Sequence, residues 1–412
     1  MASVNPFSVL VRHRNFRVFW LGQTLSLVGS WMQSMAQGWL ALELTNNAFL
    51  VGLVVSVGSL PVVLFSMHAG VLADRYEKLR LVKICQALLL VEAALLFWFT
   101  WSGHITIGWL LALATFQGVI SSLEIPARQS LVIELVGRED LPQAIALNSS
   151  GFNLARIVGP AVAALVIAKL GLSWTFGLNA ASYLAVLVGL FLIELPPWAP
   201  AARVIRPLEG IRESLVYMRD TPFVAALMKL VTVHSILGTP YIVLMPVFAR
   251  DRLGLDAAGY GLLLAWVGIG GLTGALALAA QAGRQAGKRT LRLVSYGYPA
   301  VLLLLSAVTN ARVAYVVLFF AGVGMIVSGA TANAMLQHTV PDALRGRLMA
   351  AYSFVVVGLA QTVGAFLGGV VARASGVQWA IALGAFVMLA YAWYAFRQPA
   401  LRSLGTAASP AS

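Results

Sequence analysis

Long apolar stretches separated by short charged segments run along the whole chain. Eight of these stretches contain no Asp, Glu, Lys or Arg, and they cover residues 18–42, 48–73, 170–193, 257–283, 293–311, 313–341, 348–372 and 374–396. Each is long enough to cross the ~30 Å hydrocarbon core of a bilayer as an α-helix. The pattern therefore predicts membrane-spanning helices rather than the amphipathic elements of a water-soluble domain.

Four further stretches, residues 81–101, 105–123, 141–168 and 221–249, complete a set of twelve, although three of them carry one or two ionisable groups. The composition agrees with this interpretation, because 60% of the 412 residues are hydrophobic and only 10% are charged. Soluble domains carry about 25% charged residues. We therefore predict an all-α integral membrane protein with twelve transmembrane helices.

The spans fall into two halves separated by the longest polar stretch of the chain, residues 194–220. Shifting the first half onto the second brings the starts of four spans nearly into register, which indicates a tandem repeat. The expected domains are a six-helix bundle over 1–193, a cytoplasmic linker over 194–220, a second six-helix bundle over 221–397 and a cytoplasmic tail over 398–412. Two parallel repeats that rock around a solute site near the midplane are typical of secondary transporters.

The net charge of +13 reflects membrane topology. Most of the 28 Lys and Arg residues fall in alternate loops on one side of the spans. Because positive loops stay in the cytoplasm, both termini and the linker are expected there. Binding of nucleic acid is not expected, since the basic residues are spread over short segments without interleaved stacking aromatics.

Cofactor and metal chemistry find little support in the sequence. The single cysteine, Cys85, allows no internal disulfide and belongs to no cluster of metal ligands. The chain also lacks a Gly-rich phosphate loop that ends in Lys-Ser or Lys-Thr, which argues against direct use of ATP. We expect no catalytic residues, no metal and no cofactor.

Residues 70–80, at the end of the second span, read Gly-Val-Leu-Ala-Asp-Arg-Tyr-Glu-Lys-Leu-Arg. This segment resembles the loop signature of the major facilitator superfamily, except that Glu77 stands where a second glycine is usual. A glycine lets helices approach closely, and an aspartate can latch one state of a gate by pairing with a basic group or a helix end. The alternative for the basic residues is that they only anchor the topology. The gating residues predicted here are Gly70, Asp74, Arg75, Lys78 and Arg80.

The fifth span carries small residues at every fourth position, and these are Gly151, Ala155, Gly159 and Ala163. Such a ridge lets another helix approach closely, and Pro160 is expected to bend the helix. Residues 153–160 resemble the antiporter motif of the same superfamily, which favours export over uptake and suggests gating roles for Gly159 and Pro160. Ordinary helix packing is the alternative for the ridge.

Two further segments narrow the resemblance. Residues 125–130, after the fourth span, and 340–347, after the tenth, are similar to the branch that contains enterobactin exporters and macrolide efflux proteins. Arg345 and Arg347 join the expected gating residues. The resemblance covers residues 10–397 and implies a multi-pass exporter of the bacterial inner membrane that is driven by the proton gradient. It does not identify the solute.

Polar residues at three- and four-residue steps form a stripe along the first span, and Gln117, Ser121, Glu124 and Arg128 do the same in the fourth. The resemblance assigns both helices to the central cavity, and we favour a cavity for the stripe as a whole. For any single residue, a hydrogen bond to a neighbouring helix is the alternative. The candidate solute-binding residues are Gln23, Ser26, Ser30, Trp31, Gln33, Gln37, Gln117, Ser121, Asn153, Arg156, His234, Asn333 and Gln361.

Three ionisable residues at membrane depth are candidates for ion coupling, because charges there are costly unless they pair or meet water. Glu92, midway along the third span, can bind a proton or can be a satisfied core acid. Glu124 can act in the same way or can pair with Arg128 one turn later. Arg156 keeps its charge and therefore needs an acid, carbonyl groups or an anionic ligand.

These observations predict a secondary transporter that exchanges protons for a small amphiphilic or hydrophobic solute, such as a drug or a siderophore, by alternating access. Its expected partners are the solute, protons and membrane lipids, and the protein is expected to be monomeric. One alternative is an ion-coupled importer. A less favoured one is a membrane-embedded acyltransferase that uses His338 near Asn333.

Overall fold

A computed structural model describes residues 7–195, 217–280 and 287–402, with the side chains of 66–74 and 342–343 excepted. Most of the predicted linker and of the predicted tail therefore lies outside the described residues. The chain divides into two compact units. Unit 1 contains Met1–Asn46, Val57–Ile205 and Leu255–Ala265, and unit 2 contains Asn47–Ser56, Arg206–Gly254 and Trp266–Ser412.

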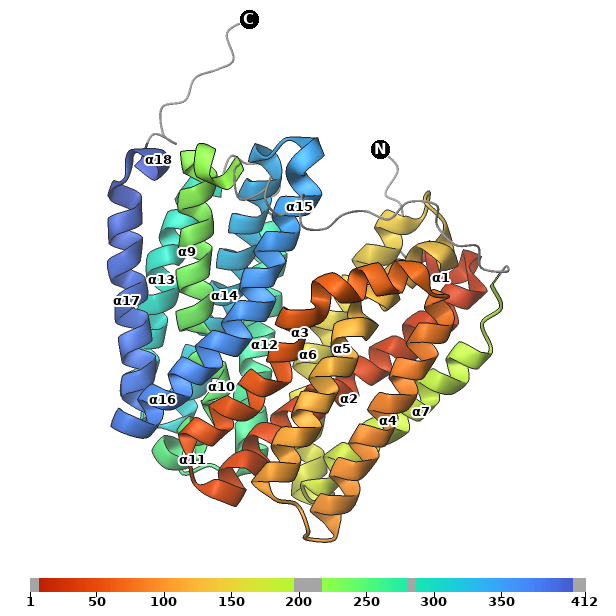
Figure 1. Cartoon of the computed structure of the whole chain (residues 1–412). Helices are drawn as coiled ribbons and strands as arrows, with labels where there is room; N and C mark the ends of the chain where they lie inside the picture. Colours follow the sequence, from red (N-terminus) through yellow and green to blue (C-terminus); the bar gives the residue numbers. More distant parts are fainter. Residues whose placement is uncertain (1–6, 196–216, 281–286, 403–412) are drawn as a thin grey trace, which may run out of the picture. The chain divides into compact units, whose positions relative to one another are not determined.

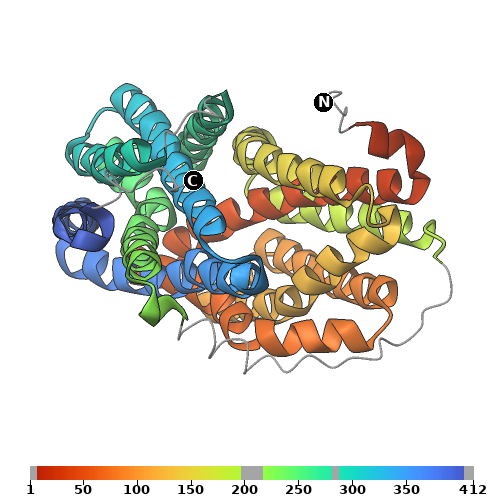
Figure 2. The ribbon, with the colours of Figure 1, turned by 90° about the horizontal axis from the view of Figure 1, so that it is seen from above.

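The helices of the first half are connected by short turns, and Figure 1 labels them in order. They are α1 (Ser8–Arg12), α2 (Arg14–Thr45), α3 (Ala48–Arg75), α4 (Lys78–Trp101), α5 (Ile107–Val136), α6 (Leu141–Leu170) and α7 (Ser173–Phe191). Within unit 1, α2 packs against both α6 and α7, while α4 lies between α5 and α7. The view from above in Figure 2 shows these helices side by side as a bundle.

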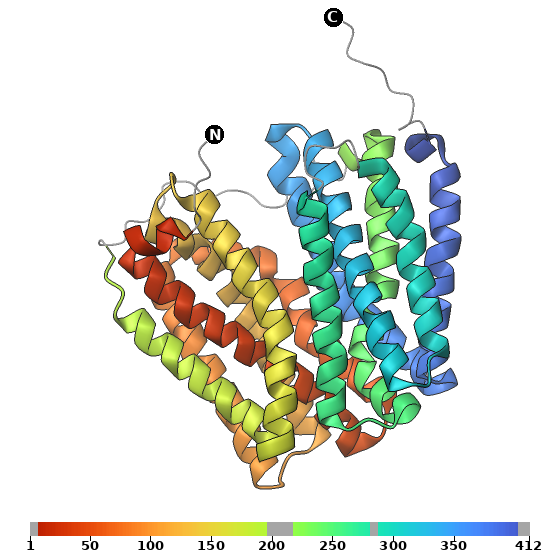
Figure 3. The same ribbon diagram turned by 180° about the vertical axis from the view of Figure 1, so that it is seen from behind.

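The second half repeats this arrangement with more interruptions, as Figure 3 shows from behind. Its helices are α9 (Pro222–Gly238), α10 (Pro240–Val243), α11 (Met245–Leu253), α12 (Ala257–Ala280), α13 (Gly287–Ala307), α14 (Ala311–Thr339), α15 (Asp342–Ser353), η1 (Phe354–Gly364), α16 (Ala365–Ser375), α17 (Val377–Arg397) and α18 (Pro399–Arg402). Within unit 2, α13 packs against α14 and α17, and α9 packs against η1.

Eleven segments of the described chain are long and apolar enough to cross a membrane. The one predicted span that is not among them is the first, which corresponds to α2, a continuous helix of 32 residues. It is not among the eleven because its stripe of amides and hydroxyls makes it less apolar than the other spans. Many large apolar side chains, such as Leu165 and Phe386, are exposed along the helices, as expected for surfaces that face lipid.

Two connections differ from the sequence-based expectation. Helix α5 continues to Val136, thirteen residues beyond the predicted end of the fourth span at residue 123, so residues 125–130 lie within a helix and not in a loop. The polar residues there continue the helix towards its end, where Lys78 of α4 pairs with Glu134 at 2.6 Å. Between α3 and α4 only two residues, Tyr76 and Glu77, interrupt the helical structure.

Two segments of unit 2 depart from a regular α-helix. The segment that begins with α9 breaks after Gly238, because Pro240 has no N–H to donate to the carbonyl of Ile236. Facing this break, residues Phe354–Gly364 form a π-helix of 11 residues, a rare geometry that is frequent at functional sites. A Cβ atom at Gly364 would collide with the Ile236 carbonyl oxygen, so the two irregular segments are in close contact.

A small apolar cluster joins α4, α5 and α7 in unit 1. Its buried members are Cys85, Leu89, Ala93, Ile120, Ala180 and Tyr183. The thiol of Cys85 is buried and forms no disulfide.

Candidate functional site

The polar stripe of α2 lies largely inside unit 1. Four of its side chains are buried, and these are Gln23, Ser26, Gln33 and Gln37. Ser30, which is half-buried, donates to or accepts from the hydroxyl of Tyr183 at 3.0 Å. The burial follows from helix packing, because α2 is covered by α6 on one side and by α7 on another.

Glu92 of α4 is the centre of a buried network of hydrogen bonds. Its side chain is 0% exposed, and the amide nitrogen of Gln33 donates to both carboxyl oxygens, at 2.9 and 3.2 Å. Asn179 of α7 in turn donates to the Gln33 amide oxygen at 2.8 Å. The network therefore links α2, α4 and α7. In this structure Gln33 forms hydrogen bonds to neighbouring helices, which is the alternative to solute binding named in the sequence analysis.

The network continues to Ser182 on the next turn of α7. The Ser182 hydroxyl lies 3.0 Å from the side-chain oxygen of Asn179 and 2.7 Å from the backbone carbonyl oxygen of the same residue. This close approach of α7 to α2 requires a glycine on α2. A Cβ atom at Gly29 would collide with Asn179 Oδ1 and would lie 2.7 Å from Ser182 Oγ.

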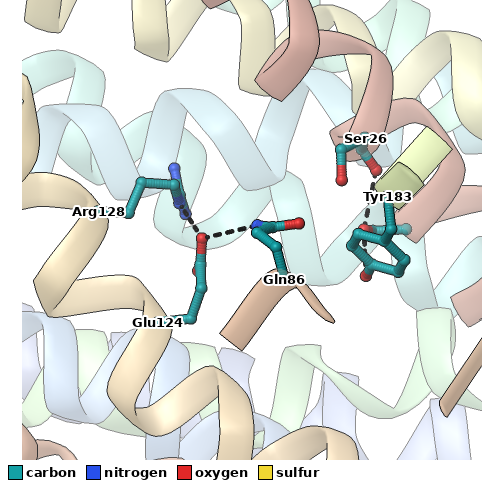
Figure 4. A network of polar contacts seen from close by, with 6 residues as sticks. Ser26, Gln86, Glu124, Arg128 and Tyr183 are labelled. Atoms are coloured by element: carbon teal, nitrogen blue, oxygen red, sulfur yellow. Dashed lines mark hydrogen bonds and ion pairs between the residues drawn. The ribbon is translucent and has the colours of Figure 1, made fainter. Parts of the chain in front are cut away.

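A second carboxyl group, Glu124 of α5, lies in the same unit. Arg128 pairs with it at 2.8 Å, as the spacing of four residues predicted, and Gln86 of α4 donates to the same oxygen at 3.3 Å. Figure 4 shows this chain of contacts beside Ser26 and Tyr183. The Glu124 side chain is 7% exposed, so its charge is balanced within the protein rather than by water.

Tyr183 of α7 adds a phenol to the polar groups of unit 1. Its hydroxyl contacts the hydroxyl of Ser30 on α2 at 3.0 Å. Figure 4 shows the tyrosine ring extending from α7 towards α2. The polar contacts of unit 1 thus include two acids, three amides and a phenol.

The small-residue ridge of α6 packs against α2. Gly151, Ala155, Gly159 and Ala163 are all buried. A Cβ atom at Gly159 would collide with Trp31 and with the backbone of α2, and one at Gly151 would lie 2.9 Å from the hydroxyl of Thr24. The ridge therefore brings two helices close together, as the repeat of small residues predicted. Pro160 is buried beside it.

The remaining candidates on α2, α5 and α6 lie at the edge of this packing. Trp31 makes an edge contact with Phe152 at 5.7 Å between ring centroids. Asn153 donates to the carbonyl oxygen of Ser149 on its own helix. Arg156 is partly exposed on α6, between the buried Ala155 and Gly159. The half-buried candidates on α5 are Gln117 and Ser121.

The candidates of unit 2 are dispersed. His234 of α9 is buried, and its two ring nitrogens face the carbonyl oxygens of Leu230 at 2.9 Å and Ser295 at 3.2 Å. Asn333 of α14 accepts from the amide of Gln337 on its own helix. Gln361 lies half-buried in the π-helix η1.

Most of the predicted gating residues lie near helix ends, whereas Gly159 and Pro160 lie inside α6. Gly70 and Asp74 belong to the last turns of α3, but their side chains lie outside the described part of the chain. Lys78 pairs with Glu134 at 2.6 Å, and Arg345 donates to the Gln337 carbonyl oxygen at 3.1 Å. The other basic residues of this group, Arg75, Arg80 and Arg347, are exposed.

The sequence analysis missed four residues of the buried network. These are Gln86, Asn179, Ser182 and Tyr183. A signal for three of them was present in the sixth span. Ser182 and Tyr183 stand three and four positions after Asn179, so the three side chains share one face of a helix. Their partners on α2 and α4 could not be predicted from the sequence, since the rotation of each helix about its axis is set by tertiary packing.

Comparison with known proteins identifies the family. The family model for transmembrane secretion effectors, within the major facilitator superfamily, matches residues 4–411. The chain belongs to this family. The staphyloferrin A transporter of Staphylococcus aureus (strain NCTC 8325 / PS 47) is 28% identical over 267 residues, which cover 64% of this chain and 66% of that protein. The enterobactin exporter EntS of Shigella flexneri is 27% identical over 354 residues, which cover 83% of this chain and 81% of that protein.

Solved structures show the same fold. A bacterial homolog of the human lysosomal transporter Spinster, inward-facing and unoccupied, has a TM-score of 0.74 at 13% identity and covers 100% of both chains. The nucleoside transporter NupG has a TM-score of 0.70 at 12% identity and covers 93% of this chain and 99% of its own. The predicted major facilitator fold of two pseudo-symmetric six-helix bundles is confirmed.

The family and the fold together define the class of protein. The chain is a multi-pass membrane protein and a secondary transporter of small molecules. The prediction of a transporter is confirmed, and the acyltransferase alternative is wrong, because the family and its relatives consist of transporters and not enzymes. His338, on which that alternative depended, is exposed at the end of α14.

Proposed function

We propose that the protein is a proton-coupled exporter of a small amphiphilic solute in the bacterial inner membrane, and that it works by alternating access. The observation that carries this proposal is the fully buried carboxyl group of Glu92, which accepts hydrogen bonds from an amide and pairs with no Lys or Arg of the described part of the chain. The relatives support the direction of transport, since one of them is an exporter of enterobactin.

The case for protons depends on the cost of a buried charge. Among the described residues, no Lys or Arg forms an ion pair with Glu92, in contrast to Glu124, which pairs with Arg128. An ionised carboxylate without a cation is unfavourable in free energy inside a membrane, and binding a proton removes this unfavourable charge. Glu92 is therefore the proposed proton site, and Glu124 with Arg128 is a second ionisable pair in the same unit.

The solute class follows from the relatives. The two relatives are named for the transport of staphyloferrin A and of enterobactin, which are both siderophores. We extend this class to the present protein, with the candidate binding residues named above as contacts. Arg156 of α6 is the proposed contact for an anionic group of the solute, because a guanidinium keeps its charge and binds carboxylates with two parallel hydrogen bonds.

The proposed mechanics use the two sequence halves. Residues 1–193 and 221–397 form the moving bundles, 194–220 forms the cytoplasmic linker and 398–412 the cytoplasmic tail. The excess of Lys and Arg in alternate loops supports a topology with both termini in the cytoplasm. The proposed functional unit is a monomer surrounded by lipid.

Inside-out membrane vesicles that contain the protein provide the test. Enterobactin, staphyloferrin A and the dye ethidium serve as probes, and an acidic lumen supplies the proton gradient. An exporter that exchanges protons for solute accumulates at least one probe in the lumen, and a protonophore abolishes the accumulation. An ion-coupled importer instead releases a preloaded probe under the same gradient. Accumulation that persists without any ion gradient contradicts the proposed coupling.

A further inference from the structure

The hydrogen bonds around Glu92 all run in one direction. Ser182 donates to the Asn179 side-chain oxygen, Asn179 donates to Gln33, and Gln33 donates to both oxygens of Glu92. A chain in which every donor faces the carboxyl group suits an ionised carboxylate, which only accepts hydrogen bonds. The same chain does not suit a protonated acid, because its O–H needs an acceptor.

We infer that Gln33 and Asn179 form a proton-responsive amide relay, whose hydrogen bonds reverse direction when Glu92 takes up a proton. The relay links α4 through α2 to α7, and Gln33 and Asn179 act as positioning residues for the proton site. The inference depends on the proposed role of Glu92, because a relay without a proton to report has no function in transport.

The reversal is fixed by the chemistry of the amide. When Glu92 carries a proton, its O–H donates to the side-chain oxygen of Gln33, which requires that amide to turn over. The Gln33 nitrogen then faces the nitrogen of Asn179, and two donors cannot bond to each other. Asn179 must therefore turn as well, so that its oxygen accepts from Gln33 and its nitrogen faces Ser182.

Ser182 is suited to end the relay in both states. In the ionised state its hydrogen is donated to the Asn179 side-chain oxygen, and in the reversed state the hydroxyl rotates and donates to the Asn179 backbone carbonyl oxygen, which lies 2.7 Å away. In the reversed state the same oxygen accepts from the turned Asn179 amide, because a hydroxyl group both donates and accepts. The reversal therefore leaves Gln33, Asn179 and Ser182 each with a partner, while the second carboxyl oxygen of Glu92 gives up its contact with Gln33.

The contact of Asn179 with Gly29 gives the relay a mechanical consequence. The side-chain oxygen of Asn179 lies against Gly29 so closely that a Cβ atom there would collide with it. Turning the amide replaces that oxygen, which tolerates a Cα–H group, with an NH₂ group that has hydrogens of its own. Protonation of Glu92 thus alters the contact between α2 and α7.

Other titratable groups in the same region define the background. Tyr183 lies on α7, where its hydroxyl contacts Ser30, and Glu124 pairs with Arg128 on α5. Cys85 lies two turns before Glu92 on α4 itself. Glu92 is distinguished from Glu124 by the absence of an ion pair among the described residues, so the amide of Gln33 is its main electrostatic support.

Infrared difference spectroscopy of the full-length protein in lipid nanodiscs tests the relay without any solute. The carboxylic C=O band that disappears in Glu92→Gln is titrated with pH. Gln33→Met removes both hydrogen bonds to the carboxylate and is expected to move the midpoint to higher pH by about one to two pH units. Asn179→Leu is expected to give a smaller shift in the same direction.

A double-mutant cycle separates a relay from two independent effects. If Asn179 acts through Gln33, Asn179→Leu gives no additional shift in the Gln33→Met background. Gln143→Met on α6 is the matched control in the same unit, because Gln143 lies outside the network and its side-chain oxygen has no partner among the described residues. It is expected to leave the midpoint unchanged. Should Gln33→Met not yield folded protein, Asn179→Leu and Ser182→Ala must each shift the midpoint.

The outcomes distinguish the relay from the proposed function. Additive shifts, or an Asn179→Leu midpoint equal to that of the unmodified protein, overturn the relay even if Glu92→Gln still abolishes proton-driven transport. Vesicles that accumulate the probes without a proton gradient refute the coupling and leave the spectroscopic test intact. If no carboxylic band can be assigned to Glu92 at any pH, both the relay and the proposed proton site are refuted.

Discussion

The interiors of the two units differ in the kind of polar group they bury. Among the described residues, unit 1 buries two acids at membrane depth, Glu92 and Glu124, together with several amides. The described interior of unit 2 buries neither a carboxyl group nor a side-chain amide. Its buried polar side chains are Ser56, His234, Ser295, Thr331 and Thr362. The pseudo-symmetry of the fold therefore does not extend to the chemistry of the two interiors.

Unit 2 has irregular helices where unit 1 has polar side chains. The break before Pro240 and the π-helix of Phe354–Gly364 are in contact in unit 2, whereas the helices of unit 1 from α2 to α7 are continuous. This difference suggests a division of labour, in which unit 1 binds the proton and unit 2 adapts its backbone. Four predictions test this division.

The largest effect is expected from removal of the proposed proton site. Glu92→Gln keeps the shape of the protonated acid but cannot release a proton, so gradient-driven accumulation should fall to the level of vesicles without the protein. Probe accumulation in inside-out vesicles measures this effect. Glu139→Gln, an exposed carboxyl group of the same unit, is the matched control and should retain accumulation. A His234→Gln variant that loses its pH dependence while Glu92→Gln keeps it would reverse the division between the units.

The next effect concerns the close packing that the network requires. Gly29→Val places atoms against Asn179 and Ser182, and overpacking of this kind should lower the free energy of unfolding by about 1–3 kcal/mol. Thermal unfolding in detergent measures the loss. Gly297→Ala in unit 2 is the control, because no atom lies within 4 Å of the added Cβ. Equal stability of the two variants would show that α2 and α7 are not held at this distance.

A smaller effect is expected in the irregular part of unit 2. Pro240→Ala supplies the missing N–H and favours a continuous helix from α9 into α10, which should slow transport severalfold. Because no titratable group changes, the pH dependence should remain that of the unmodified protein. Initial rates measured over a series of pH values separate the two effects. A displaced pH profile would link this break to the proton site.

The smallest effect is expected at the ion pair between α4 and α5. Lys78→Met removes the partner of Glu134, but both side chains are partly exposed, at 17% and 31%. Ion pairs of this kind contribute less than about 1 kcal/mol, so the unfolding temperature should change little. If accumulation nevertheless falls strongly in this variant, the contribution of Lys78 is to gating and not to stability.

The sequence allowed the spans to be predicted because charge-free stretches reflect the bilayer directly. Contacts within one helix were equally accessible, and the pair of Glu124 with Arg128 at a spacing of four residues is an example. The ridge of α6 was accessible for the same reason. The bond from Asn179 to Gln33 was not, since it joins residues 146 positions apart and depends on how two helices are rotated.

The π-helix shows a different limit of prediction. Phe354–Gly364 contains valines and glycines that fit an ordinary transmembrane helix, so the local pattern gives no indication of the wider turn. Its position opposite the break at Pro240 indicates that contact between the two segments, and not local preference, selects this geometry. Pro240 itself was visible in the sequence, but its consequence for a second helix was not.

The buried position of Cys85 has a practical consequence for measurements of movement. The chain contains one cysteine, and its thiol is 2% exposed within the cluster of α4, α5 and α7. Thiol-reactive labels should therefore leave the unmodified protein almost unlabelled. Pairs of cysteines introduced at exposed helix ends can then carry spin labels or fluorophores in the native background, with no residue of the interior replaced.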